Sequence, residues 1–114
     1  MGITGLGHIY AETNDWESSA SFWRGLGFEF AERWGSDGHR AGRLQSGSAS
    51  VVIAEVEGEP QFTVFFALEG GDAFSMGPGI TVDTPLEDTH WGTRWIRVRD
   101  ADGRVHALEE EAAS

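Results

Sequence analysis

The sequence predicts one α+β domain built from two passes of a strand–helix–strand–strand–strand plan. Three observations predict this class. Short stretches alternate apolar with other residues, which is typical of strands. One stretch has helical spacing behind a start signal. The turn-forming segment Gly58-Glu59-Pro60 separates the two passes. We therefore expect a single domain over residues 1–114, with module 1 over about 1–58 and module 2 over about 61–114.

The first pass opens with a strand over residues 4–11, whose alternation puts Leu6, His8 and Tyr10 on one face. A helix follows, because Asn14 and Glu17 have the spacing of an N-terminal capping box. Apolar residues then recur at helical spacing, and two glycines end the helix; these residues are Trp16, Ala20, Trp23, Gly25 and Gly27.

Three further strands complete the first pass. The second pass repeats the order of strands but lacks a full helix. The first of the three alternates, with Phe30 and Trp34 on one side. The remaining expected strands are residues 39–44, 50–56, 61–68, 80–82, 93–99 and 104–110, with a tight turn at 100–103. Where a second helix belongs, residues 70–79 are rich in glycine, so we expect at most one helical turn around 72–75.

The composition excludes several classes of protein. The 114 residues carry a net charge of −11, with eight arginines and no lysine. This balance argues against nucleic acid and anionic membranes as partners and could attract a cationic ligand, or it could only solubilise the surface. No cysteine is present, so we expect neither a disulfide nor a thiolate metal site. No secretory signal or membrane-spanning run is visible, and a cytoplasmic location is the expectation.

Three segments stand in order along the chain: the His8 strand with its capped helix, residues 21–28 (SFWRGLGF), and the segment from Trp91-Gly92 through Asp100 and Gly103 to Glu109. Together they resemble the vicinal oxygen chelate superfamily of glyoxalases, extradiol dioxygenases and bleomycin resistance proteins. The resemblance implies paired βαβββ modules whose curled sheets form a cavity, with the second helix truncated here. It also implies a homodimer completed by strand exchange.

The resemblance places one metal ligand on each of four strands, and this chain retains one of them. His8 stands at the first position, whereas Ala54 and Ala107 stand at two others and the strand at 61–68 has no histidine. Glu109 shares a face with Ala107 but lies about 7 Å along the strand. Because such sites need about three protein ligands, we expect no metal and no other cofactor.

Within the superfamily, a cavity without metal is most similar to the bleomycin resistance branch. The resemblance implies a non-catalytic protein that sequesters an aromatic, cationic antibiotic and gives resistance or self-protection. Trp91 is the residue carried over from the family's ligand contacts, and packing is its alternative role. The other candidate ligand contacts are Trp34, Phe30, His8, Tyr10, His39, His90 and Glu109, for which core packing or plain solvation are the alternatives.

Two other functions remain open at this point. One is an enzyme of the same fold, either a metal-dependent lyase or dioxygenase or a metal-independent tailoring enzyme in natural-product biosynthesis. The other is a small regulatory or scaffold module. No nucleophile–base motif or phosphate-binding glycine loop favours a hydrolase or nucleotide-binding protein.

Overall fold

The computed structural model describes residues 2–111, and its contacts divide the chain into two compact units. The first unit is His8–Phe62. The second unit begins at Thr63 and includes the residues before His8. Strand β1 (Gly2–Thr13) therefore contributes its beginning to the second unit and its end to the first.

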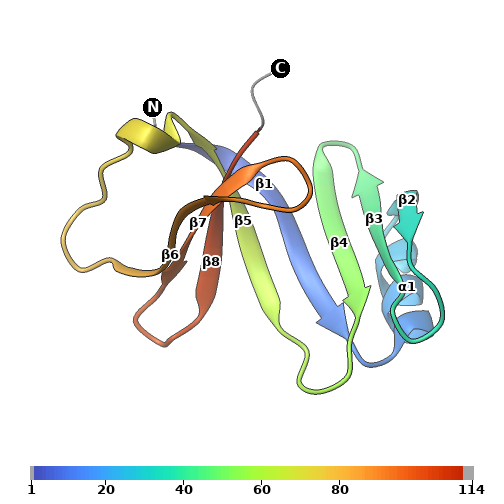
Figure 1. Cartoon of the computed structure of the whole chain (residues 1–114). Helices are drawn as coiled ribbons and strands as arrows, with labels where there is room; N and C mark the ends of the chain where they lie inside the picture. The colour runs from blue at the N-terminus through green and yellow to red at the C-terminus, as the bar shows by residue number, and fades with distance from the viewer. Residues whose placement is uncertain (1, 112–114) are drawn as a thin grey trace. The chain divides into compact units, whose positions relative to one another are not determined.

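The first unit is a sheet with one helix against it (Figure 1). Its strand order is β2-β3-β4-β1, with β1 parallel to β4 and the other neighbours antiparallel. The elements after β1 are α1 (Trp16–Gly25), β2 (Glu29–Trp34), β3 (Ala41–Ser46) and β4 (Ala49–Glu55). The expected element order of this pass is confirmed.

The helix begins one residue later than the capping prediction placed it. Asp15 is the N-cap, and its Oδ1 accepts the backbone N–H of Ser18 at 3.1 Å. Asn14 instead donates its amide to the carbonyls of Val56 and Gly58, at 2.7 and 2.8 Å. The capping box was therefore wrong, because the Asn14 side chain binds the loop after β4. The helix ends as predicted, with Gly27 at a φ of 104°.

Alternation along the strands of the first unit creates an apolar core beneath α1. Leu44 and Ile53 are fully buried. They pack with Trp16, Ala20 and Val51, and burying such side chains contributes roughly 1.5–3 kcal/mol each. The opposite face of the same strands holds Tyr10, which pairs with Val52 on β4.

The second unit is also a sheet, with the order β5-β8-β7-β6. Strands β5 and β8 are parallel, whereas β8, β7 and β6 follow one another antiparallel. The strands are β5 (Phe62–Glu69), β6 (Thr81–Asp88), β7 (Arg94–Arg99) and β8 (Val105–Glu110). The predicted turn over residues 100–103 joins β7 to β8, and Gly103 there has a φ of 83°.

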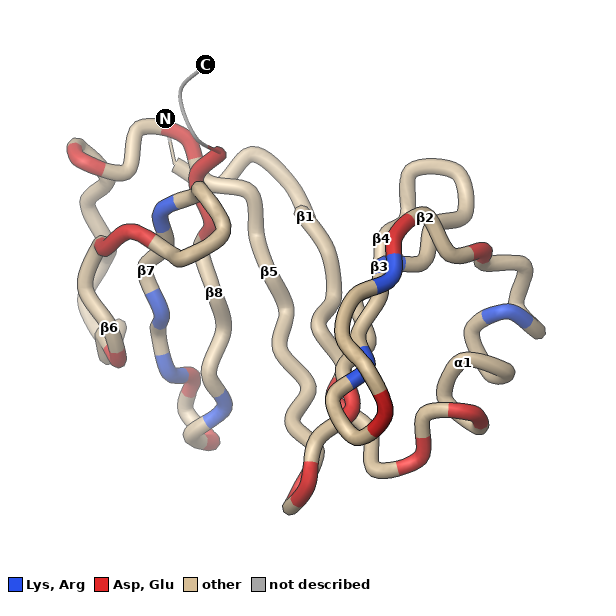
Figure 2. The backbone as a smooth tube through the Cα atoms, turned by 45° about the vertical axis from the view of Figure 1, so that its right-hand side comes forward, with Lys and Arg blue, Asp and Glu red and all other residues tan. Residues whose placement is uncertain are grey.

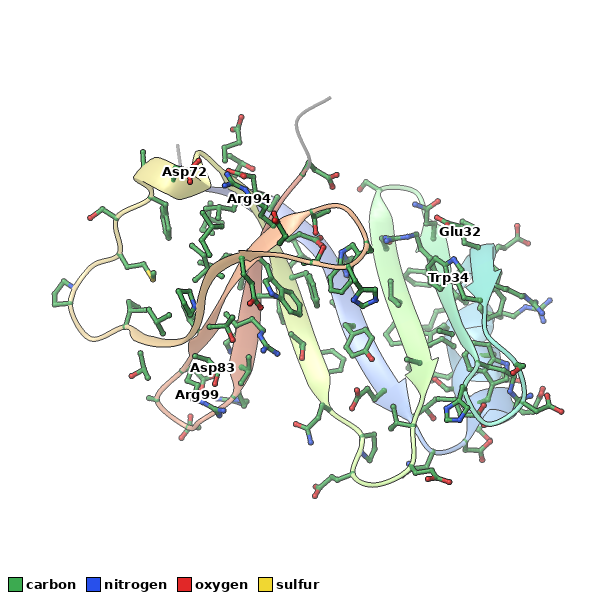
Figure 3. All side chains as sticks on the ribbon, viewed as in Figure 1. Glu32, Trp34, Asp72, Asp83, Arg94 and Arg99 are labelled. Atoms are coloured by element: carbon green, nitrogen blue, oxygen red, sulfur yellow. The ribbon has the colours of Figure 1, made fainter. Side chains whose placement is uncertain are left out.

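The truncated second helix is confirmed as the 3₁₀ turn η1 (Gly71–Ala73). Glu110 accepts the backbone N–H of Gly71 and forms an ion pair with Arg94, which also pairs with Asp72 at 3.1 Å. Figure 3 shows Asp72 and Arg94 pointing toward one another beside this turn. In place of a helix, Phe74 and Met76 pack on the core of Leu68, Ile96 and Leu108.

Strand β6 is longer than the sequence predicted. Residues 80–82 were expected, but β6 continues to Asp88. Its register against β7 shifts between Val82 and Thr84 and again between Thr84 and Glu87. These irregularities break the alternation that identifies a strand, and Pro85 is tolerated because β6 is an edge strand. Among the described residues, no helix is long and apolar enough to cross a bilayer.

Candidate functional site

The two faces of the second sheet differ in chemistry. Ile96 and Leu108 point to the apolar core. The alternate residues point to the other side, where Trp95 lies opposite Glu109 and Arg97 opposite Ala107 in the β7–β8 register. We call this second side the tryptophan face; its residues are Phe65, Glu87, Trp91, Trp95, Arg97, Ala107 and Glu109.

Trp91 is held on this face by a carboxylate. Its indole Nε1–H donates to Glu109 Oε2 at 2.8 Å, and the Thr93 hydroxyl donates to the same oxygen at 2.9 Å. The loop before β7 is closed by four hydrogen bonds between Thr89 and Thr93, of 2.9 to 3.1 Å. The Trp91 side chain is therefore oriented while its residue remains 46% exposed.

A second indole lies beside the first and is held in the same way. Trp95 donates its Nε1–H to Glu87 Oε1 at 2.9 Å. The rings of Trp91 and Trp95 meet edge to face with centroids 5.1 Å apart, and Phe65 packs on Trp95 at 5.9 Å. Phe65 is only 6% exposed, so the aromatic residues range from a buried ring to an exposed one.

Arg97 is the cation that lies over an aromatic ring of the tryptophan face. The Arg97 guanidinium lies over the Trp95 ring, 4.7 Å from its centroid, and its Nε–H donates to the Thr84 hydroxyl at 3.1 Å. Asp83 is 3.9 Å from Arg97 but only 2.8 Å from Arg99. Figure 3 shows Asp83 and Arg99 together near the β7–β8 turn, and Figure 2 shows the basic residues spaced along β7.

The structure brings together three of the candidate residues in the second unit. Trp91 and Glu109 are hydrogen-bonded, and the His90 ring meets the Trp91 ring edge to face at 4.8 Å. His106 lies on the face opposite Ala107, and its Nε2 lies 2.9 Å from Asp100 Oδ2 in the turn. Asp100 thus serves the turn, and its charge-stabilising hydrogen bonds, first with His106, lower its pKa.

Two candidates lie on β1 in the first unit. His8 and Tyr10 share the face opposite α1, as predicted from the alternation, since Ile9 between them packs toward the helix. The Tyr10 hydroxyl donates to Glu12 Oε2 at 3.2 Å. Burial, and then the negative charge of Glu12, raise the pKa of Tyr10 to about 12. Tyr10 is therefore a neutral hydrogen-bonding group near neutral pH.

The prediction that Phe30 and Trp34 share a side was wrong. The β2–β3 register shifts between Phe30 and Glu32, so Phe30 pairs with Leu44 and Trp34 with Ala41. Leu44 and Ala41 are three residues apart and point to opposite faces. Phe30 consequently stacks on Trp16 in the helix-side core, at 5.9 Å. Trp34, 44% exposed, lies on the same face as Tyr10, and His39 is exposed in the turn before β3.

The residues at the positions where the sequence resemblance places metal ligands do not fit a metal ion. Ala107 is fully buried and offers only a methyl group, and it is flanked in register by Phe65. Glu55, beside Ala54, is held by Arg40 at 3.0 Å. Hydrogen bonds from Arg40 lower the pKa of Glu55 to about 2. Within residues 2–111, no group of three His, Asp or Glu residues is arranged to hold a metal.

Sequence reasoning missed four residues of the tryptophan face: Phe65, Glu87, Trp95 and Arg97. The available signal was the alternation of Thr93, Trp95 and Arg97 along one strand, in step with Glu109 on the next. Glu87 could not be found in this way, because the irregular β6 strand had been expected to end at Val82. These residues make the candidate site an aromatic surface with carboxylates at the indole nitrogens and one arginine.

The sequence matches no protein-family model and no curated protein. Its structure is similar to that of a hypothetical protein from Bacillus halodurans C-125, with a TM-score of 0.72 and 12% identity over 96% of this chain and 95% of that one. It is also similar to a glyoxalase/bleomycin resistance protein/dioxygenase superfamily member from Vibrio splendidus 12B01, with a TM-score of 0.70 and 14% identity over 91% and 97% of the two chains.

A third similar structure is the Mn(II)-bound glyoxalase from Novosphingobium aromaticivorans, with a TM-score of 0.66 and 14% identity. The match covers 98% of this chain and 40% of that one. Because the sequence identities are this low, the comparisons establish the fold alone. The predicted glyoxalase/bleomycin resistance fold, α+β with paired βαβββ modules, is confirmed.

Proposed function

We propose that this chain binds a planar aromatic cation at the tryptophan face and sequesters it without chemical change, as a drug-binding or self-protection protein of the bleomycin resistance type. The observation that carries the proposal is the Trp91–Glu109 pair. An exposed indole is fixed in one orientation by a carboxylate 2.8 Å from its nitrogen. A ligand that stacks on this ring therefore lies close to a negative charge.

Aromatic stacking would supply the contact area. The edge-to-face packing of Trp91 on Trp95 restricts the rotation of the exposed ring. Because the ring is already ordered, binding a ligand costs less conformational entropy. A stacked pair of rings contributes about 0.5–1.5 kcal/mol beyond the burial of their area. Of the three aromatic side chains of this surface, Trp91 is the most exposed.

Charge would supply the preference for a cation. Among residues 2–111, both donors to the Glu109 carboxylate lie on Oε2, so Oε1 can accept from a cationic ligand. The net charge of −11 adds a long-range attraction for cations. These features support binding by stacking and charge together.

Fluorescence titration with proflavine, a planar aromatic cation, tests the proposal. The Trp91→Ala variant should bind proflavine more than tenfold more weakly than wild type. It loses both the stacking interaction with the dye and the apolar area that the indole buries on binding. Phe22→Ala is the matched control, because Phe22 is an exposed aromatic on α1 outside the site. Equal affinities of wild type and Trp91→Ala would exclude the tryptophan face as the binding surface.

An enzyme of the same fold is the alternative, and two measurements separate it from a binding protein. Metal analysis of the purified protein should find no stoichiometric Ni, Zn, Fe or Mn after dialysis, and titrations with and without EDTA should coincide. Mass spectrometry of the bound dye should recover it unaltered. Stoichiometric metal that resists dialysis would overturn the proposal. The homodimer implied by the superfamily is a separate proposal, tested by whether sedimentation equilibrium gives the mass of two chains.

A further inference from the structure

Arg97 is a cation beside Glu87 and Glu109, the two carboxylates that hold the indoles of the tryptophan face. It lies opposite Ala107 in the β7–β8 register, on the same side of the sheet as Glu109. Its guanidinium covers one side of the Trp95 ring at 4.7 Å. An arginine at this position does not help to bind a simple cation, so it calls for a separate explanation.

The hydrogen-bonding capacity of Arg97 is incompletely used. Its Nε–H donates to Thr84 at 3.1 Å, and within residues 2–111 no acceptor is hydrogen-bonded to its terminal Nη atoms. Arg99, two residues along, is different. Its Nε donates to Asp83 at 2.9 Å and its Nη1 to the carbonyl of Gly103 at 2.9 Å. Asp83 is thus occupied by Arg99 and lies 3.9 Å from Arg97.

We propose that Arg97 binds an anionic oxygen of the same ligand, so that the preferred ligand is a planar aromatic zwitterion with a carboxylate. The inference rests on the proposed function, because it assigns the second polar contact of that site. A guanidinium with free paired donors fits a carboxylate geometrically. Arg97 lies opposite Ala107, which is two residues, or about 7 Å of strand, from Glu109, so the cationic and anionic groups should be separate parts of the ligand.

Rhodamine B and its ethyl ester are matched probes for this inference. Both contain the same planar cationic ring system, but rhodamine B carries a free carboxylate where the ester carries none. Long-range attraction to a protein of net charge −11 favours the ester, which has the larger positive charge. A preference for rhodamine B would therefore report a local contact with the carboxylate. Dye fluorescence anisotropy measures both affinities.

We expect wild type to bind rhodamine B about tenfold more tightly than the ester, because the contact is a charge-assisted hydrogen bond. Arg97→Gln should bring the ratio of the two affinities close to one, and Arg97→Lys should keep part of the preference. Arg33→Gln is the control, since Arg33 also lies over an aromatic ring, 4.1 Å from Phe30, but on the helix side of the first unit. This variant should keep the full preference.

The outcomes separate this inference from the proposed function. If neither dye binds in a way that Trp91→Ala weakens, both are overturned. If both dyes bind but wild type favours the ester or does not distinguish them, only the role of Arg97 is overturned. A preference that survives in Arg97→Gln also overturns it. A wild-type ratio that does not favour rhodamine B overturns the role of Arg97 even if circular dichroism shows that an Arg97 variant does not fold.

Discussion

The indole nitrogen of Trp91 and the carboxylate of Glu109 are joined by a hydrogen bond of 2.8 Å, across 18 residues of sequence. This bond links the loop before β7 to the end of β8 and fixes the exposed ring of the tryptophan face. The same Glu109 oxygen also accepts a hydrogen bond from the Thr93 hydroxyl, so one carboxylate holds the loop at two of its residues. The role of Glu109 is therefore to position Trp91 as well as to supply charge.

Two substitutions at Glu109 separate these roles. Glu109→Gln keeps an oxygen that can accept both hydrogen bonds but removes the charge, so proflavine affinity should fall by about 1 kcal/mol or less, as for an exposed ion pair. Glu109→Ala also releases Trp91, and we expect a larger fall. Fluorescence titration measures both variants. Glu59→Gln, an exposed site in the first unit, controls for the change in net charge. Equal losses in the two Glu109 variants would argue against a positioning role.

The Glu55–Arg40 ion pair predicts an acid dependence of folding. The folded-state pKa of Glu55 is lowered from 4.5 to about 2, chiefly by the hydrogen bonds from Arg40. This contribution to stability is therefore fully present above pH 4.5 and is lost as the pH falls toward about 2. Urea unfolding can be measured at neutral pH and at a pH midway between 4.5 and about 2. The free energy of unfolding should fall less between these two conditions in Glu55→Gln than in wild type.

Glu57→Gln is the control for this experiment, because Glu57 is exposed two residues away. It should follow the wild-type pH dependence. Asp100 and Glu110 also have lowered pKa values, so a residual acid dependence is expected in Glu55→Gln. An unchanged pH dependence in that variant would show that the Arg40 pair does not stabilise the folded chain.

Tyr10 offers a direct measurement, since it is the chain's single tyrosine. The ultraviolet absorbance of the phenolate should titrate with a midpoint of about 12 in the folded protein and near 10.0 in urea. Because the folded-state value is the higher one, stability should fall as the pH rises between them. Glu12→Gln should lower the midpoint only in part, since burial is the larger cause. A folded-state midpoint near 10.0 would contradict the burial of Tyr10.

Much of the fold could be predicted from alternation and element order. The strands and the helix of the first unit follow directly from the residue pattern, and the glycines of residues 70–79 predict the absence of a full second helix. The errors have local physical causes. Asn14 binds carbonyls after β4 instead of capping α1, and the register shift after Phe30 turns it to the face opposite Trp34.

The candidate site was harder to predict because its contacts depend on register. Trp91 and Glu109 were identified as separate candidates, but their hydrogen bond requires the loop before β7 to reach the end of β8. Trp95 is an ordinary strand residue in the sequence. It becomes part of the site because three residues lie against it. Glu87 accepts its indole N–H, Glu109 lies opposite it on β8, and the Arg97 guanidinium lies over its ring.

The register shift in β2 leads to a last prediction, which concerns Gly42. Across from the shift, a Cβ on Gly42 would lie 2.7 Å from Cε1 of Phe30 and 2.9 Å from the carbonyl oxygen of Glu32. Gly42→Ala should therefore destabilise the fold by about 1–3 kcal/mol, as overpacking does. Gly25→Ala is the control, because nothing lies within 4 Å of its Cβ and alanine favours a helix by up to about 1 kcal/mol. Urea unfolding should give opposite signs for the two variants, and a Gly42→Ala protein as stable as wild type would show that the sheet relaxes around the added methyl group.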